Sequence, residues 1–190
     1  HARPYVLTWG VERRKRHPYI GFDNRAAARE VARHVLSLGH RRIAVLSAPL
    51  DGNDRGRERM AGFRAALAEA GVPLPDANVQ HAKIGLADGQ EGMERLLAVR
   101  PRPTAVLATN DVMAVGAMLA CRRHGIDIPG EISVTGIDNT ELGATQTPAL
   151  TSVDTPIVEI GRTAAQQLVA RLEGREFPAH VALPFEVVVR

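Results

Sequence analysis

Carboxylate and amide side chains follow two apolar segments of this chain, at positions where they could contact a ligand. Residues 104–108 are followed by Asn110 and Asp111, and residues 132–136 are followed by Asp138. If both segments are parallel strands of one open α/β sheet, these side chains meet at its carboxyl edge, where such sheets bind ligands. The sequence therefore predicts a ligand site at this edge.

A guanidinium group is the third candidate at the same edge. The apolar segment 42–47 leads through a polar loop to Arg57, which begins an expected helix over 57–70. An arginine presents five donors in a fixed fork and can hold two ligand oxygens at once. Together with carboxylate and amide groups, it forms a planar donor and acceptor set suited to vicinal hydroxyls or a heterocycle edge.

Each of these polar groups also has a structural alternative. Asp111 is expected to cap the helix that follows it, and Asn110 is open between capping and ligand contact. Arg57 could instead pair with Asp51 or Asp54 on the surface, an interaction worth about 0–1 kcal/mol. Asp138 precedes a stretch with no clear helix start, so capping explains it less well.

Signatures of catalysis and of metal or cofactor binding are absent from the sequence. It contains no glycine-rich dinucleotide or phosphate loop, no G-x-S-x-G and no H-E-x-x-H. Its seven histidines are scattered without metal-ligand spacing, and Cys121 is the single cysteine, expected to be a buried thiol. We therefore expect no catalytic residue, no metal and no cofactor, and a protein that is not an enzyme.

The bulk composition is that of a globular protein. The 190 residues are 45% hydrophobic with a net charge of +3, and no stretch approaches the roughly 18 apolar residues of a membrane span. The basic run 12–17 lacks helical periodicity and interleaved aromatics, so it is expected to be a solvated loop. The lack of disulfides fits a reducing cytoplasm, which gives a cytoplasmic location without membrane association.

Short apolar segments alternate regularly with helical patterns along the chain. Such alternation predicts an α/β fold, a doubly wound parallel sheet covered by helices on both faces. Thr155 and Pro156 suit the N-cap and first position of one helix. Strands are expected at 4–9, 19–22, 42–47, 78–82, 104–108, 132–136, 150–154 and 185–189, and helices at 24–38, 57–70, 89–99, 112–124 and 156–172.

Six motifs, in order along nearly the whole chain, resemble the lactose-repressor/galactose-repressor (LacI/GalR) family of bacterial transcription regulators. They are Asp23-Asn24, LGHRRIAVLSAP (38–49), RERMAGFRAALAEAG (57–71), PTAVLATNDVMAVGAM (103–118), IPGEISVTGIDN (128–139) and PALTSVDTPIVEIGRTA (148–164). The resemblance implies a type I periplasmic-binding-protein-like effector region that lacks the N-terminal DNA-binding head. It assigns 1–20 and 155–178 to the N-terminal subdomain, and 21–154 and 179–190 to the C-terminal subdomain.

The resemblance also implies the ligand contacts. Carried over by position, the family's effector contacts fall on Arg57, Asn110 and Asp138. Ile84 lies where some sugar-responsive members place an aromatic that stacks on the ligand, and its aliphatic side chain disfavours a stacked pyranose. Thr155 and Trp9 are further candidates near the crossover strands, and Trp9 could equally be a core or interface residue.

The function implied is the effector-binding domain of a ligand-responsive transcription regulator, most simply a repressor. Its partners would be a small metabolite such as a sugar or nucleoside, operator DNA bound through an N-terminal domain outside this chain, and a second copy in a homodimer. The rival readings are a periplasmic solute-binding protein of a sugar transporter, and an enzyme on a flavodoxin-like sheet.

A physical consequence follows for this segment in isolation. The apolar stripe of the helix at 156–172 would lack partners from the rest of its subdomain and could drive self-association. With half of the cleft outside the chain, ligand binding by this segment alone should be weak.

Overall fold

The computed structural model describes residues 4–190, which fold into two compact units. The smaller unit contains the described residues up to Asn24 together with Thr155–Phe185, and the larger unit contains Arg25–Asp154 and Glu186–Arg190. These ranges differ at their ends from the expected 1–20, 21–154, 155–178 and 179–190. Residues 1–3 of the first expected range lie outside the described residues.

The larger unit is built on a six-stranded sheet in the order β4-β3-β5-β6-β7-β9. The first five strands are parallel, and β9 runs antiparallel to β7. Its alternation with helices confirms the expected α/β doubly wound sheet. The strands are β3 (Ile43–Ser47), β4 (Val79–His81), β5 (Ala105–Ala108), β6 (Ser133–Asp138), β7 (Thr151–Asp154) and β9 (Glu186–Val188).

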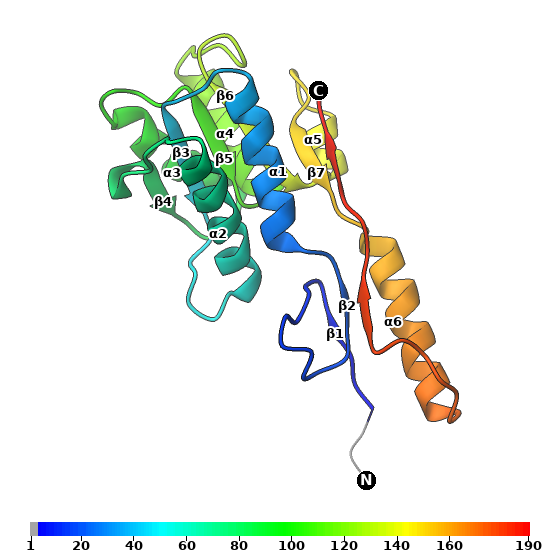
Figure 1. Cartoon of the computed structure of the whole chain (residues 1–190). Helices are drawn as coiled ribbons and strands as arrows, with labels where there is room; N and C mark the ends of the chain where they lie inside the picture. The colour runs from blue at the N-terminus through cyan, green and yellow to red at the C-terminus, as the bar shows by residue number, and fades with distance from the viewer. Residues whose placement is uncertain (1–3) are drawn as a thin grey trace. The chain divides into compact units, whose positions relative to one another are not determined.

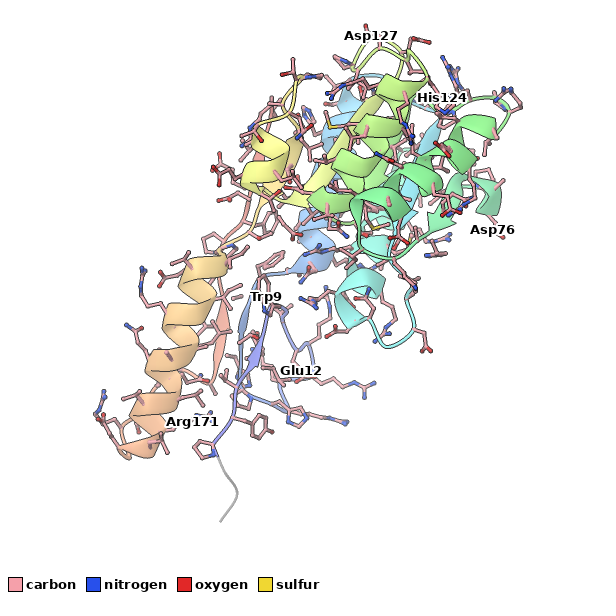
Figure 2. The ribbon with its side chains drawn as sticks, turned by 180° about the vertical axis from the view of Figure 1, so that it is seen from behind. Trp9, Glu12, Asp76, His124, Asp127 and Arg171 are labelled. Atoms are coloured by element: carbon pink, nitrogen blue, oxygen red, sulfur yellow. The ribbon has the colours of Figure 1, made fainter. Side chains whose placement is uncertain are left out.

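Helices cover both faces of this sheet. Figure 1 shows α1 (Asn24–Ser37) and α2 (Asp54–Glu69) in front of the sheet, and the reverse view in Figure 2 brings α3 (Leu86–Ala98) and α4 (Asp111–Arg123) to the front. α3 and α4 approach closely because two glycines face each other between them. A Cβ at Gly116 would lie 2.4 Å from the Leu86 carbonyl oxygen, and one at Gly89 would lie 2.7 Å from the Met113 carbonyl oxygen.

The hydrophobic core fills the space between sheet and helices. Every residue of β3 and β5 is buried, as expected for strands covered on both faces. Cys121 is buried in the α3–α4 layer, and burial raises the pKa of its thiol to about 11, so it is an inert core group.

The smaller unit is a three-stranded parallel sheet in the order β1-β2-β8, with the helix α6 beside it. Its strands are β1 (Leu7–Thr8), β2 (Tyr19–Gly21) and β8 (His180–Ala182), and α6 spans Ile157–Leu172. Between β1 and β2, the Glu12 carboxylate accepts hydrogen bonds from the backbone N–H groups of Arg14 and Arg16. The basic side chains of this loop are exposed, as expected.

Several element boundaries differ from the sequence-based expectation. α2 begins at Asp54, not at residue 57, because the Asn53 side chain caps it by accepting from Gly56 N–H at 2.9 Å. α6 begins at Ile157, and Thr155 does not cap it. The strand β8 and the short helix α5 (Glu141–Ala144) were not expected. α5 is capped by the Thr140 hydroxyl directly after the stretch that carries Asp138.

Among the described residues, no helix has the length and apolar character needed to cross a membrane. Within the same part of the chain, no three His, Cys, Asp or Glu side chains are grouped as metal ligands would be.

Candidate functional site

The strand order of the larger unit creates one topological switch point, between β3 and β5. The chain leaves β3 toward β4 on one side and leaves β5 toward β6 on the other, so the loops at their carboxyl ends diverge. In doubly wound sheets, this divergence opens the crevice in which ligands bind. The polar groups at this place are Arg59 of α2, Thr109 and Asn110 after β5, and Asp138 at the end of β6.

A buried arginine joins these segments. Arg59 lies in the second turn of α2, and its side chain is only 9% exposed. Its Nη2 donates to Asp138 Oδ1 at 3.1 Å, and its Nη1 donates to the Thr109 carbonyl oxygen at 2.5 Å. One guanidinium therefore ties α2 to the carboxyl ends of two neighbouring strands.

Burial dominates the electrostatics of this ion pair. Desolvation raises the pKa of the Asp138 carboxyl above its usual value; the Arg59 charge opposes this shift and the nearby Asp111 adds to it. Desolvation likewise lowers the pKa of Arg59, with the Asp138 charge opposing it. Both charges are therefore held where water solvates them poorly, and polar ligand atoms placed beside them would interact strongly.

The turn that carries the aspartate is strained. Asp138 has φ 121° and Asn139 has φ 48°, both in the region that favours glycine. Such conformations cost about 1–3 kcal/mol each for other residues and persist only where the surroundings enforce them. Here the Asn139 N–H donates to the Ser152 hydroxyl at 3.1 Å, which fixes the turn against β7.

A fully buried carboxylate lies beneath this turn. Asp111 accepts hydrogen bonds from the Thr140 N–H at 2.6 Å, the Thr140 hydroxyl at 3.0 Å and the Ser152 hydroxyl at 2.5 Å. Only glycine fits at position 136, because a Cβ there would lie 2.2 Å from Asp111 Oδ1. The expectation that Asp111 caps α4 was wrong: it is the first helical residue, and it locks α4 to the turn and to β7.

Asn110 is the N-cap of α4. Its Oδ1 accepts from the Met113 N–H at 2.9 Å, and the residue is 6% exposed. Capping uses the amide oxygen and leaves the amide N–H₂ as the donor for any ligand contact.

Comparisons with known proteins agree with this architecture. The family model of the periplasmic binding protein-like domain matches residues 32–190. A regulatory protein of LacI family from Chloroflexus aggregans superposes with a TM-score of 0.85 at 30% identity, covering 97% of this chain and 74% of that one. The transcription regulator GntR from Chromobacterium violaceum gives 0.91 at 31% identity, covering 98% and 69%.

Curated relatives are regulators as well. The HTH-type transcriptional regulator DegA of Bacillus subtilis is 39% identical over 176 residues, covering 90% of this chain and 50% of the relative. The HTH-type transcriptional repressor PurR of Salmonella paratyphi B is 35% identical over 173 residues, with the same coverage. The chain belongs to the LacI/GalR family. It spans about half the length of these curated relatives.

In this LacI/GalR chain, the arginine at the strand ends is Arg59 and not the expected Arg57. Arg57 is exposed, and its Nη1 donates to the Leu50 carbonyl oxygen at 2.8 Å, within the preceding loop. A sequence signal for Arg59 existed. Arg59 falls on the buried stripe of α2, which includes Gly56 and Phe63, and a lone charge on such a stripe indicates a specific buried partner.

Three other expected contacts occupy different places. Ile84 follows β4 at the same edge of the sheet and is 62% exposed. Trp9 and Thr155 belong to the smaller unit, where the Trp9 carbonyl oxygen accepts from Asn24 Nδ2 at 2.8 Å. The Thr155 hydroxyl oxygen is buried and has no hydrogen-bond partner among the described residues. Figure 2 labels Trp9 in the smaller unit.

Proposed function

We propose that this chain is the effector-binding part of a ligand-responsive transcription regulator, a repressor, and that its effector binds at the carboxyl edge of the larger sheet. The observation that carries the proposal is the buried Arg59–Asp138 pair, which lies at the carboxyl edge next to the topological switch point and has its aspartate in a strained turn. A fold that needed only stability would be expected to solvate these charges or replace them, because burying a charge pair rarely stabilises a protein.

The polar groups at this edge favour a ligand with several hydroxyls or a heterocycle edge. Asp138 supplies carboxylate oxygens at the end of β6, and Asn110 supplies an amide N–H₂ after the neighbouring strand β5. A sugar or a nucleoside has this chemistry. One structural neighbour, the regulator CelR in its cellobiose complex, superposes at TM-score 0.90 and 31% identity, which supports a sugar. Ile84 would offer an aliphatic contact, and Thr155 and Trp9 remain candidate contacts from the smaller unit.

Regulation requires the effector to favour one of two states of the protein. Its affinity must differ between the state that binds operator DNA and the state that does not, since equal affinity shifts nothing. We propose that DNA contact lies in a part of the protein outside this chain, and that the protein acts as a homodimer in the cytoplasm. The transporter-protein alternative gains no support, because the relatives are transcription regulators.

Titration calorimetry tests the proposal. The full-length protein is titrated with cellobiose, monosaccharides, purine bases and nucleosides, and the variants Asp138→Asn and Arg59→Lys are compared with Arg57→Ala. We expect binding of one compound to weaken at least about tenfold in the first two variants and to stay unchanged in the third. Equal affinity in all variants would refute the site, and no binding by any compound would refute the ligand class.

A further inference from the structure

The strained turn after β6 is bonded to the last residue before one place where the chain passes between the units, and to a residue of the segment that follows another. The chain leaves the larger unit after Asp154 and re-enters it at Glu186. Asp154 is in register with Asp138 on one side and with Glu186 on the other. Asp138, Asp154 and Glu186 therefore form one row across β6, β7 and β9. This row contains the proposed ligand contact and the residues at both crossings.

Asn139 links this row through its side chain. Its Nδ2 donates to Asp154 Oδ1 at 2.9 Å, and its Oδ1 accepts from Arg190 Nη2 at 2.7 Å. Asp154 ends β7 directly before the crossing. One amide thus touches the last residue before the first crossing and the segment that follows the second.

Arg190 secures the other end of the link. Its Nη1 donates to the Leu150 carbonyl oxygen at 2.7 Å, and its N–H donates to the Thr151 hydroxyl at 3.0 Å. These bonds hold the segment after β9 against the start of β7. The Asn139 oxygen is therefore bonded to a group fixed by backbone contacts, not to a freely moving side chain.

We propose that Asn139 is a positioning residue. It couples the Asp138 carboxylate, the proposed effector contact, to the two chain crossings at Asp154 and Glu186. The inference rests on the proposed function of Asp138 as the effector contact. A shift of the Asp138 turn on ligand binding would then move the ends of β7 and β9 through the Asn139 amide.

The chemistry of position 139 explains why it is an asparagine. The link needs one donor for Asp154 and one acceptor for Arg190, and an amide supplies both. The backbone at φ 48° also favours a residue that tolerates the left-handed region, as asparagine does better than most. Aspartate would keep the acceptor and place a second carboxylate against Asp154, whereas glycine would keep the backbone and lose both bonds.

A side-chain swap tests the link. Hydrogen–deuterium exchange of the full-length protein is followed in peptides covering 150–157 and 184–190, with α3 as the internal reference. Asn139→Asp should speed exchange in both peptides about five- to tenfold, which is the loss of roughly one hydrogen bond. The double variant Asn139→Asp with Asp154→Asn exchanges the donor and acceptor and should restore exchange to within about twofold.

Coupling to Asp138 is tested in the same assay without any ligand. Asp138→Asn should speed exchange at the two crossings in the Asn139 protein and have no effect in the Asn139→Asp background. An equal effect in both backgrounds, no effect in either, or failure of the swap to restore exchange would overturn the proposal. If Asn139→Asp does not fold, Asn139→Gly takes its place in the Asp138→Asn comparison.

These outcomes are independent of the effector assignment. Calorimetry that finds no binding would refute the proposed function and leave the exchange results intact as evidence of the link. Conversely, Asp138→Asn could abolish effector binding while Asn139→Asp leaves exchange at the two crossings unchanged. That result would support the proposed function and refute the coupling.

Discussion

The two edges of the larger sheet place polar groups in contrasting ways. At the amino edge, His40 bonds to the Thr104 hydroxyl through Nδ1 at 3.0 Å and to the Ser133 hydroxyl through Nε2 at 3.1 Å, so three segments are joined by partners with no formal charge. At the carboxyl edge, the corresponding link is the buried ion pair of Arg59 and Asp138.

Backbone strain also differs between the two edges, and it is again greater at the carboxyl edge. Three helix-to-strand turns at the amino edge have positive φ at Gly39, Gly71 and Gly125, where glycine pays no steric penalty. At the carboxyl edge, the strand-to-loop turn after β6 has positive φ at Asp138 and Asn139. The amino edge therefore joins its elements through glycine turns and uncharged hydrogen bonds, while the carboxyl edge has a strained turn and a buried ion pair at the place proposed for the effector.

The largest effect is expected from removing the buried guanidinium. Arg59→Leu leaves Asp138 without its counter-charge, so the free energy of unfolding should fall by about 3 kcal/mol and effector binding should be lost. Chemical denaturation and calorimetry measure the two quantities. Arg57→Leu is the matched control, and a loss above about 1 kcal/mol in that exposed variant would contradict the distinction between the two arginines.

Asp111→Ala should have the next largest effect. The substitution leaves two hydroxyls and one backbone N–H, which donate to the carboxylate in the native protein, without this acceptor. The free energy of unfolding should therefore fall by about 2–3 kcal/mol. Asp111→Asn keeps an acceptor and should lose less. Urea denaturation at a fixed pH compares them, and equal losses in both variants would show that the acceptor geometry does not matter.

His40→Ala should cost about 1–2 kcal/mol, for two hydrogen bonds, and leave effector affinity unchanged. Burial lowers the pKa of His40 in the folded protein below its ordinary value of 6.5. As the pH falls, the unfolded chain therefore binds a proton at this histidine before the folded chain does. The contribution of neutral His40 to the free energy of unfolding is present above pH 6.5 and is lost as the pH falls through the folded pKa. Thermal melts from pH 8 to 5 should show a shallower decline in His40→Ala; an identical decline would refute the assignment.

The smallest effect is expected at the glycine turns of the amino edge. Gly125 has φ 64°, and nothing lies within 4 Å of a Cβ placed there, so Gly125→Ala adds backbone strain without a clash. It should lower stability by about 1 kcal/mol without changing effector binding. A change in effector affinity would show that the two edges are coupled through the sheet.

The sequence predicted most of the elements because their signals are local. Apolar runs, helix-stopping glycines and strand-end polar groups gave the parallel sheet, its helices, and Asn110 and Asp138 as residues at its carboxyl edge. Boundaries set by a side-chain cap, as at Asn53, were less accurate. The strand β8 was not expected, since its three residues form a strand only by pairing with β2.

The sequence alone thus determined the alternation of strands and helices, and with it the sheet edge at which polar side chains gather. It could do so because hydrophobic periodicity and turn chemistry depend on residues close together in the chain. Only the tertiary structure decided that Arg59 and not Arg57 faces Asp138, that Asp111 is a buried lock and Asn110 the cap, and that Asn139 joins the turn to Arg190. Apart from the local Asn110 cap, these contacts join residues 29 to 79 positions apart, and the local sequence pattern does not distinguish between the candidates for them.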